Sequence, residues 1–136
     1  MLKSCSYCGG IHQFGYDCPK KPKRIKSTEG LMGEIHKART TQRWFKVRDY
    51  VRERDQHLCQ LCVRNLYHTL QRYTFNNTQV HHVIPMKEDE DRNLWYNSEN
   101  LLLVCKYHHD MCERGEVPRE EQLEIVREQE YKYSNY

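Results

Sequence analysis

The sequence predicts a small α+β fold in which clusters of Cys and His supplement a modest apolar core. Only 38% of its 136 residues are hydrophobic, 30% are charged, and the mean hydropathy is −1.00. A chain this short and polar generally depends on disulfides, bound ions or a partner as well as on its core. Seven Cys and eight His are available for such a role. The odd number of Cys, with no apolar signal region at residues 1–10, favours metal binding or free thiols over a disulfide framework.

Helical and strand patterns follow one another along the chain, which is typical of the α+β class. Apolar residues at positions i, i+3 and i+7 predict a helix over 42–55, and two further helices are predicted at about 107–114 and 119–131. A short β-branched segment that ends before a proline predicts a strand over 79–84. The apolar run 100–104 is too short for its periodicity to distinguish strand from helix.

Three segments are predicted: a compact Cys/His element at 1–19, a basic linker or loosely packed arm at 20–40, and a domain at 41–136. Residues 1–57 carry 13 Lys and Arg against 6 Asp and Glu, whereas residues 58–136 carry 9 against 13. The basic first half indicates a polyanionic partner, most simply nucleic acid; an ordinary solvated surface is the alternative. Because no run of about 18 apolar residues is present, we expect no transmembrane helix, no membrane partner and a cytoplasmic location.

The first Cys/His cluster has the spacing C-x2-C-x3-H-x5-C and consists of Cys5, Cys8, His12 and Cys18. Two thiolates on one tight turn, completed by a later His and Cys, suit a tetrahedral zinc ion. The segment resembles the CCHC zinc knuckle, which binds single-stranded nucleic acid, but it has three rather than four residues before the His. A redox-active Cys pair is the alternative. Three aromatic residues would either stack on bases or cover the zinc: Tyr7, Phe14 and Tyr16.

The second cluster joins two corners that lie some forty residues apart. Cys59 and Cys62 form a CxxC turn, and Cys105 and His108 form a CxxH pair. Two corners of this kind make a closed structural zinc site. Three more His are not needed for such a site: His81 and His82, which lie in the segment between the two corners, and His109, which follows the second corner directly. They indicate that this part of the chain has a chemical role beyond the binding of a structural zinc ion.

At these residues the stretch 43–114 resembles the HNH endonuclease family. The matching motifs, in order, are the CxxC turn, His-His-Val-Ile-Pro at 81–85, Asn-Leu at 100–101, and Cys-Lys-Tyr-His-His at 105–109. The resemblance implies a ββα-metal fold, in which a hairpin and a helix are clamped on one metal. The opening of this stretch is also similar to phage-encoded members found beside DNA-packaging genes.

The resemblance implies a role for each matching residue. His82 would be the general base, since imidazole titrates near neutral pH. His81 and His109 would hold a catalytic divalent ion, and Asn100 would hold the loop that carries His82. The family more often has Asp where this chain has His81, so the ion is left open among Mg²⁺, Mn²⁺, Ni²⁺ and Zn²⁺.

Other residues near the motifs carry weaker signals. Glu113 lies at i+4 from His109, and we expect a solvent-facing charge there, with metal binding as the alternative. Cys112 is expected to be a small buried hydrophobic residue, with zinc binding as the alternative. Basic residues on the helix 42–55 are candidates for phosphate contacts with DNA: Arg43, Lys46, Arg48 and Arg52.

These observations predict a metal-dependent HNH DNA endonuclease with two structural zinc ions and one catalytic divalent ion. By the same resemblance, its partners would be DNA and a phage terminase large subunit, which it would assist in DNA packaging. The main alternative is a non-catalytic, zinc-bound nucleic-acid-binding protein. A third hypothesis is a protein-interaction domain that is stabilised by bound metal, which the basic first half of the chain disfavours.

Overall fold

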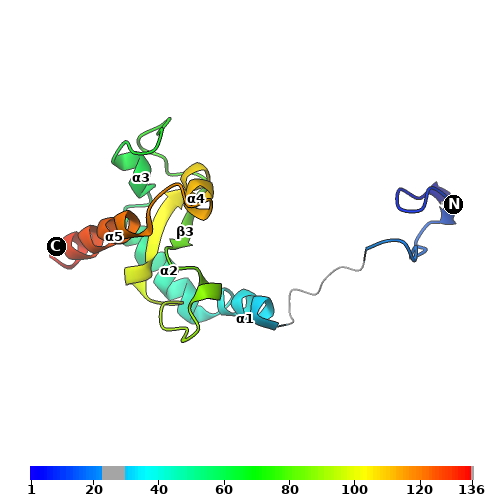
Figure 1. Cartoon of the computed structure of the whole chain (residues 1–136), viewed down its shortest axis with the longest axis horizontal. Coiled ribbons are helices and arrows are strands. Elements are labelled where there is room, and N and C mark those ends of the chain that lie inside the picture. The colour runs from blue at the N-terminus through cyan, green and yellow to red at the C-terminus, as the bar shows by residue number, and fades with distance from the viewer. Residues whose placement is uncertain (23–29, 136) are drawn as a thin grey trace.

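The structure is a computed structural model that describes residues 1–22 and 30–135. Within these ranges it contains five α-helices and two small antiparallel sheets of two strands each, a mixture that fits the predicted α+β class (Figure 1). Residues 1–22 are called the N-terminal element below, and residues 30–135 the main domain. None of the described helices is long and apolar enough to cross a membrane.

A hairpin-like pair of strands lies at the centre of the main domain. β3 (Thr78–His82) pairs antiparallel with β4 (Leu101–Cys105), so that His81 lies opposite Leu102. All five residues of β4 are buried because its two faces are both covered. Leu101 and Leu103 pack toward α2 (Gln42–Arg54), and the alternate residues of the strand pack toward the last helix, α5 (Arg119–Ser134). The apolar run that periodicity alone left unclassified is therefore a strand buried on both sides.

The helices begin and end close to the predicted positions. α2 starts after Thr41, whose side chain accepts a hydrogen bond from the backbone N–H of Trp44 at 3.2 Å. α4 (Lys106–Glu113) follows β4 directly and ends before Gly115, which has a φ of +77° that suits glycine. α5 runs three residues past its predicted end. A single short turn of helix, α3 (Gln60–Val63), contains Cys62, the second cysteine of the CxxC turn.

The segment 20–40 differs from the predicted linker or arm over its second half. α1 (Gly30–Ala38) is a helix in the main domain (Figure 1). Its side chains Ile35 and Ala38 are buried against Met86 and Trp95. Few apolar residues are present in this segment, but they share one face of the helix, and an indole from a distant loop completes the cluster. Residues 23–29, which hold much of the predicted basic run, lie outside the described residues.

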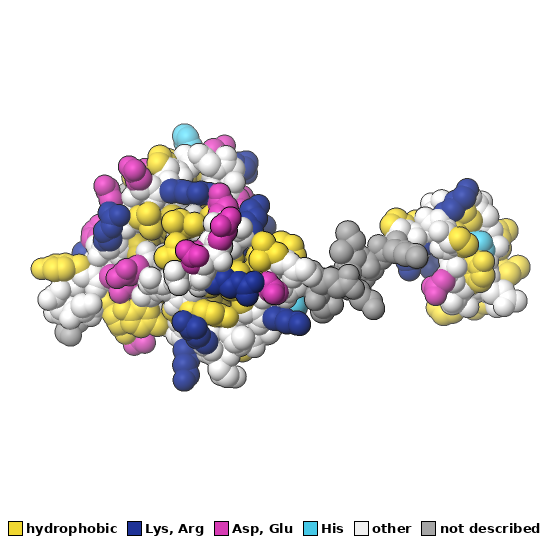
Figure 2. Space-filling model, turned by 60° about the horizontal axis from the view of Figure 1, so that its bottom comes forward, with side chains coloured by type: hydrophobic (Ala, Val, Ile, Leu, Met, Phe, Trp, Pro, Cys, Tyr) yellow, Lys and Arg dark blue, Asp and Glu magenta, His cyan; other side chains and the backbone are white. Residues whose placement is uncertain are grey.

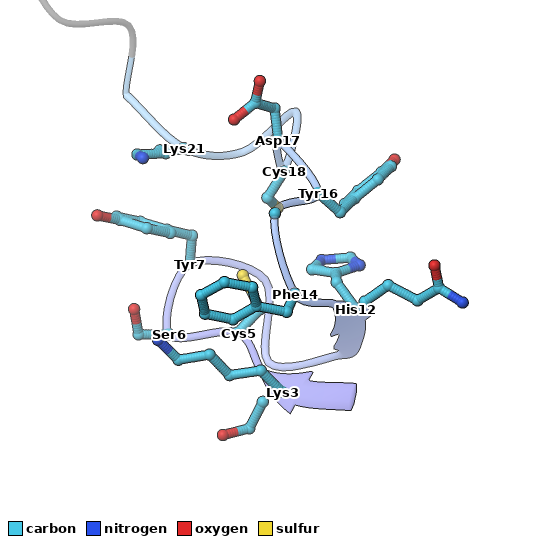
Figure 3. Close-up of a pocket in the computed structure, with 13 residues that line it drawn as sticks. Lys3, Cys5, Ser6, Tyr7, His12, Phe14, Tyr16, Asp17, Cys18 and Lys21 are labelled. Carbon is cyan, nitrogen blue, oxygen red and sulfur yellow. The ribbon is translucent and has the colours of Figure 1, made fainter. Parts of the chain in front are cut away.

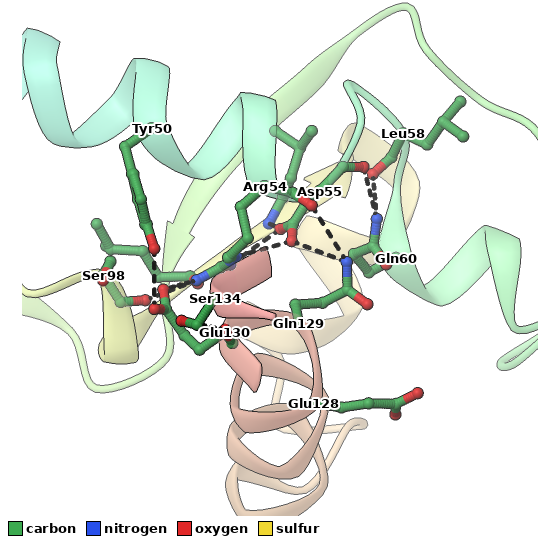
Figure 4. Close-up of polar contacts among 12 residues, drawn as sticks. Tyr50, Arg54, Asp55, Leu58, Gln60, Ser98, Glu128, Gln129, Glu130 and Ser134 are labelled. Atoms are coloured by element: carbon green, nitrogen blue, oxygen red, sulfur yellow. Dashed lines mark hydrogen bonds and ion pairs between the residues drawn. The ribbon is translucent and has the colours of Figure 1, made fainter. Parts of the chain in front are cut away.

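Arg54, the last residue of α2, is buried inside the main domain, whereas the other basic residues of this helix are exposed or only partly buried. Its guanidinium bonds the Asp55 carboxylate at 2.9 Å, Glu130 of α5 at 2.8 Å and the backbone oxygen of Leu101 at 2.7 Å (Figure 4). Asp55 also accepts a hydrogen bond from the backbone N–H of Leu103 at 3.0 Å. The pair therefore ties α2, β4 and α5 together with charge-assisted hydrogen bonds.

We expect Asp55→Ala to lower the free energy of unfolding by about 3–5 kcal/mol, because the Arg54 guanidinium would stay buried without its carboxylate. Urea denaturation followed by circular dichroism measures the change. Asp49→Ala is a matched control, since Asp49 pairs with the adjacent Arg48 but its side chain is 68% exposed. That variant should lose less than about 1 kcal/mol. Equal losses in the two variants would show that the buried Arg54 guanidinium does not depend on the Asp55 carboxylate.

Candidate metal centres and active site

The second Cys/His cluster comes together where β4 meets α4, against the CxxC turn. Cys59, Cys62, Cys105 and His108 are all buried. Nδ1 of His108 lies 3.4 Å from each of the three Cys sulfurs, and the sulfurs of Cys62 and Cys105 lie 3.8 Å apart. The cluster has the ligand atoms of a four-coordinate site facing one point.

These spacings fit a tetrahedral zinc ion. With zinc–sulfur and zinc–nitrogen bonds of ordinary length, the edges of the tetrahedron are about 3.8 Å between sulfurs and about 3.6 Å from sulfur to nitrogen. Nε2 of His108 lies 3.1 Å from the backbone oxygens of Leu66 and Tyr67. Because a carbonyl only accepts, Nε2 carries the proton and Nδ1 offers its lone pair to the ion. The four residues form a candidate structural zinc site, as the sequence predicts.

The N-terminal element holds the other predicted zinc cluster. β1 (Leu2–Ser4) pairs antiparallel with β2 (Ile11–Gln13). The ligand atoms of Cys5, Cys8, His12 and Cys18 all lie within 4.8 Å of one another. The backbone N–H of Cys8 lowers the pKa of Cys5 to about 6, which favours the thiolate that binds metal. This group is a second candidate zinc site.

Aromatic side chains surround a pocket of about 280 Å³ beside this cluster (Figure 3). Figure 3 shows Phe14 and His12 facing the pocket, with Tyr7 and Tyr16 at its two sides. The exposed fractions of Tyr7, Phe14 and Tyr16 are 52%, 75% and 56%. The three rings thus leave much of their surface open to solvent, which keeps them available for stacking on a base.

A third group of ligand atoms forms between β3 and α4. The rings of His81 and His109 meet edge to face, with centroids 5.0 Å apart. The Glu113 carboxylate lies 3.7 Å from Nδ1 of His81 and 3.5 Å from Nε2 of His109. One helical turn separates Glu113 from His109, so both side chains share a face of α4. Glu113 is exposed, as the sequence predicts for a solvent-facing charge, and its carboxylate also lies within reach of both imidazoles, which is the arrangement that the metal-binding alternative requires.

His82 lies beside this group and is buried. Its Nε2 lies 3.0 Å from the backbone oxygen of Trp95, which makes Nε2 the protonated nitrogen and leaves Nδ1 free to accept a proton. The ring stacks on Trp44 of α2 with centroids 5.2 Å apart. Burial lowers the pKa of His82 below its ordinary 6.5, against the opposing effect of the Trp95 hydrogen bond, and the charge of Arg39 adds to the lowering.

Asn100 fixes the turn that follows His82. Its side-chain oxygen accepts a hydrogen bond from the backbone N–H of Ile84 at 2.9 Å, and its side-chain nitrogen donates to the backbone oxygen of Ile84 at 3.0 Å. Its own backbone oxygen accepts from Val83 at 2.9 Å. These bonds take Val83 and Ile84 out of the strand, so β3 ends two residues before the predicted 79–84.

Both adjacent His residues line one cleft of about 430 Å³. Consecutive side chains of a regular strand point to opposite faces, but the strand ends at His82, where the chain turns. The cleft also contains His109 and Glu113 and is walled by α1, α2 and the turn after β3. None of its other lining residues was predicted as a site residue, and they include Arg39, Trp44 and Lys87. Arg39 directly follows α1, within the segment 20–40 that was predicted to be a linker, and no sequence motif marks it as a site residue.

The four basic residues predicted to contact DNA lie outside this cleft. Arg43 and Lys46 line a separate groove of about 610 Å³, where the Arg43 guanidinium lies 4.5 Å from the centre of the Tyr96 ring. Arg48 pairs with Asp49, and Arg52 is partly buried. Figure 2 shows Lys and Arg side chains interspersed with apolar ones on the face of the main domain in view. Phosphate contacts by these four residues stay a prediction.

Cys112 does not belong to any of the three groups among the described residues. It is partly buried and packs against the core that includes Cys105 and Val126. Burial raises the pKa of its thiol to about 12. The side chain therefore behaves as a small hydrophobic residue, which is the interpretation that the sequence favours.

One comparison with known proteins agrees with the resemblance to HNH endonucleases. A stretch of 69 residues is 32% identical to a protein named "Probable HNH endonuclease" from Lactococcus phage SK1. The match covers 49% of this chain and 65% of that protein. No protein-family model matches the chain, and no solved structure matches it. The similarity supports the family loosely and suggests a nuclease.

We expect the two zinc clusters to load independently. Cys59→Ser should lose about one zinc ion per chain and should unfold the main domain, because the ion ties the CxxC turn to β4. Cys8→Ser should also lose about one ion, while the main domain keeps its melting temperature. Cys112→Ser serves as the control and should keep both ions. Elemental analysis and thermal denaturation measure these changes; retention of full zinc by Cys8→Ser would remove the N-terminal site.

Proposed function

We propose that the main domain is a DNA endonuclease of the HNH type, which hydrolyses phosphodiester bonds with a divalent ion held by His81, His109 and Glu113. The observation that carries this proposal is the cleft, where three ligand atoms lie beside a buried imidazole whose Nδ1 is free. A purely structural domain needs neither feature. The similarity to a named HNH endonuclease supports the same class of activity.

The ligand set fits a catalytic rather than a structural ion. Two imidazoles and one carboxylate provide three protein ligands, and the open cleft leaves room for water and substrate. When bound, a divalent ion there polarises the phosphate and stabilises the leaving oxygen. Imidazole ligands suit Zn²⁺ and Ni²⁺, whereas the carboxylate suits Mn²⁺ and Mg²⁺, so the mixed set favours Mn²⁺, Ni²⁺ or Zn²⁺ over Mg²⁺.

His82 is suited to take a proton from the attacking water. Its Nε2–H donates to the Trp95 backbone oxygen, so the ring is held in one orientation with Nδ1 as the basic atom. The same oxygen stabilises the imidazolium that forms when Nδ1 is protonated. Asn100 acts indirectly, because its two hydrogen bonds to Ile84 hold the turn after His82.

Arg39 and Lys87 give the cleft a positive rim. Both side chains are exposed and line the cleft, and within residues 1–22 and 30–135 neither forms an ion pair with a carboxylate. Unpaired cations beside a metal-ligand group suit an anionic phosphodiester, whose charge increases on the reacting oxygens in the transition state. We assign Arg39 to the stabilisation of that charge.

The alternative is a zinc-bound protein that binds nucleic acid without cutting it. The exposed aromatic rings of the N-terminal element are the observation that favours binding. Binding and cleavage are compatible, but a binder has no use for the three-ligand group in the cleft. Assistance to a phage terminase stays a prediction from the resemblance.

His82→Ala should lower the rate of plasmid cleavage by about 10²- to 10⁴-fold, because the general base would be lost. The variant should keep its zinc and its melting temperature. His36→Ala, an exposed His on α1, is the matched control and should cut as the wild type does. If the wild type binds DNA but cuts none with Mn²⁺, Ni²⁺, Zn²⁺ or Mg²⁺, the non-catalytic alternative holds instead.

Arg39→Ala should lower the single-turnover cleavage rate at saturating DNA by about 10²-fold, since one preorganised donor to the reacting phosphate is removed. Arg43→Ala provides the comparison, because Arg43 lies on the neighbouring groove. It should weaken DNA binding and reduce its salt dependence, and it should leave the single-turnover rate unchanged. A wild-type rate in Arg39→Ala would contradict the role assigned to this arginine.

A further inference from the structure

The groove of about 610 Å³ between α2 and the loop 93–98 has a positive lining. Arg43 and Lys46 are exposed there, and in the part of the chain that the structure describes neither forms an ion pair with a carboxylate. No Asp or Glu among the described residues lines the groove. Its lining also includes two aromatic rings and two amides: Tyr50, Tyr96, Asn93 and Asn97. A groove of this charge suits an anionic partner.

The Tyr96 ring fixes the position of the Arg43 guanidinium. The central carbon of the guanidinium lies over the ring, 4.5 Å from its centre, which is a favourable cation–π contact. The ring is itself held, because it packs against the cluster that contains Trp44 and Leu101, and its hydroxyl donates to the backbone oxygen of Ala38 at 3.3 Å. A guanidinium has five N–H donors, so one that a ring holds in place can bind a phosphate with little further loss of side-chain freedom.

The combination of cations with aromatic rings favours a single strand over a duplex. The phosphates of either form would suit Arg43 and Lys46, which are three residues apart and share a face of α2. A base, however, can stack on a tyrosine ring or a guanidinium only when it is unpaired or turned out of the duplex. The side-chain oxygen of Asn97 accepts from the backbone N–H of Glu99 at 3.0 Å, so its NH2 group is the part that can donate to such a base.

The groove and the cleft are built from neighbouring residues of the same two segments. On α2, Arg43 lines the groove, whereas Trp44 lines the cleft and stacks on His82. On the loop, the backbone oxygen of Trp95 bonds to His82, and the next residue, Tyr96, lines the groove. A strand whose reacting phosphate lies in the cleft can therefore continue along the groove.

We propose that this groove binds a single-stranded segment of nucleic acid, with phosphates on Arg43 and Lys46 and a base on the aromatic surface beside them. The substrate of the main domain is then DNA that is unpaired next to the phosphate in the cleft. The choice of substrate rests on the proposed function, whereas the binding of a single strand in the groove does not.

The test measures the binding of two labelled probes to the full, zinc-loaded chain, with no further divalent ion added. The probes are oligo(dT) of about 12 nucleotides and a duplex of the same length, which match the usual size of a single-strand site. Fluorescence anisotropy gives the dissociation constants. The N-terminal element is the same in every variant, so a difference between variants comes from the main domain.

Three variants alter the groove, and one is a matched control. Arg43→Ala removes a groove cation, Tyr96→Leu removes the ring that holds it, and Tyr96→Phe keeps the ring. Arg48→Ala is the control, because Arg48 lies on the same helix and over the Phe45 ring, 4.9 Å from its centre. Arg48 nevertheless pairs with Asp49 and does not line the groove.

We expect Arg43→Ala and Tyr96→Leu to bind the single strand about 10-fold more weakly, because a stacking surface and a held phosphate donor are lost. Both variants should bind the duplex no more than about 3-fold more weakly, since only a phosphate contact is lost there. Tyr96→Phe should bind both probes as the wild type does, and Arg48→Ala should change either affinity by less than about 2-fold.

Equal losses for the two probes in Arg43→Ala, or a loss in Arg48→Ala as large as that in Arg43→Ala, would overturn the proposal, because the groove would then contribute only general charge. Arg43 is exposed, so Arg43→Ala and its control decide the outcome even if Tyr96→Leu does not fold. A wild type that binds the single strand as expected but cuts no DNA would support the proposal for the groove and contradict the proposed function alone.

Discussion

The arrangement of the main domain depends on the cluster of three Cys and one His at the junction of β4 and α4. His108 and His109 are consecutive residues of α4, about 100° apart around the helix axis. When His108 is tied to Cys59, Cys62 and Cys105, the helix can no longer rotate, so the direction of His109 is set as well. The distance between the His109 and His81 rings would thus follow from the geometry of the neighbouring Cys/His cluster.

A strand that is buried on both faces compensates for the small number of apolar residues in the chain. β4 is a strand of only five residues, but it is buried on both faces, so each of its side chains contributes to a core. α2 covers one face, and α4 and α5 cover the other. The Arg54–Asp55 pair then joins the two layers at the end of α2 (Figure 4). Such a buried pair contributes little by itself to stability, but its hydrogen bonds to β4 and α5 favour one arrangement of the three elements.

What the sequence predicts well is what depends on local spacing. Each Cys/His corner, the N-cap of α2 and the glycine stop after α4 involves residues only a few positions apart, so the local geometry of each follows from the chain itself. The predictions were wrong where a distant segment decides the outcome. Arg54 has the pattern of a surface cation, and only the carboxylates of Asp55 and Glu130 make its burial favourable. The helix α1 depends on Trp95, some sixty residues away.

The same distinction between local spacing and contacts of distant segments applies to the prediction of the candidate site. The resemblance to the HNH family assigns His81 and His109 to one group. It does not show that Glu113 reaches both rings, because that depends on how close α4 lies to β3. Arg39 comes from the segment before α2 and meets the site only in the folded chain.

Burial also sets the protonation state of the proposed ligand group. Because burial, together with the charges of His109 and His82, lowers the pKa of His81 to about 4, its imidazole is neutral near pH 7, and an ion bound there would not have to displace a proton from it. Among the described residues that line the cleft, Glu113 provides the one carboxylate. The desolvation that lowers the pKa of His81 would therefore favour the binding of a divalent cation by the proposed group.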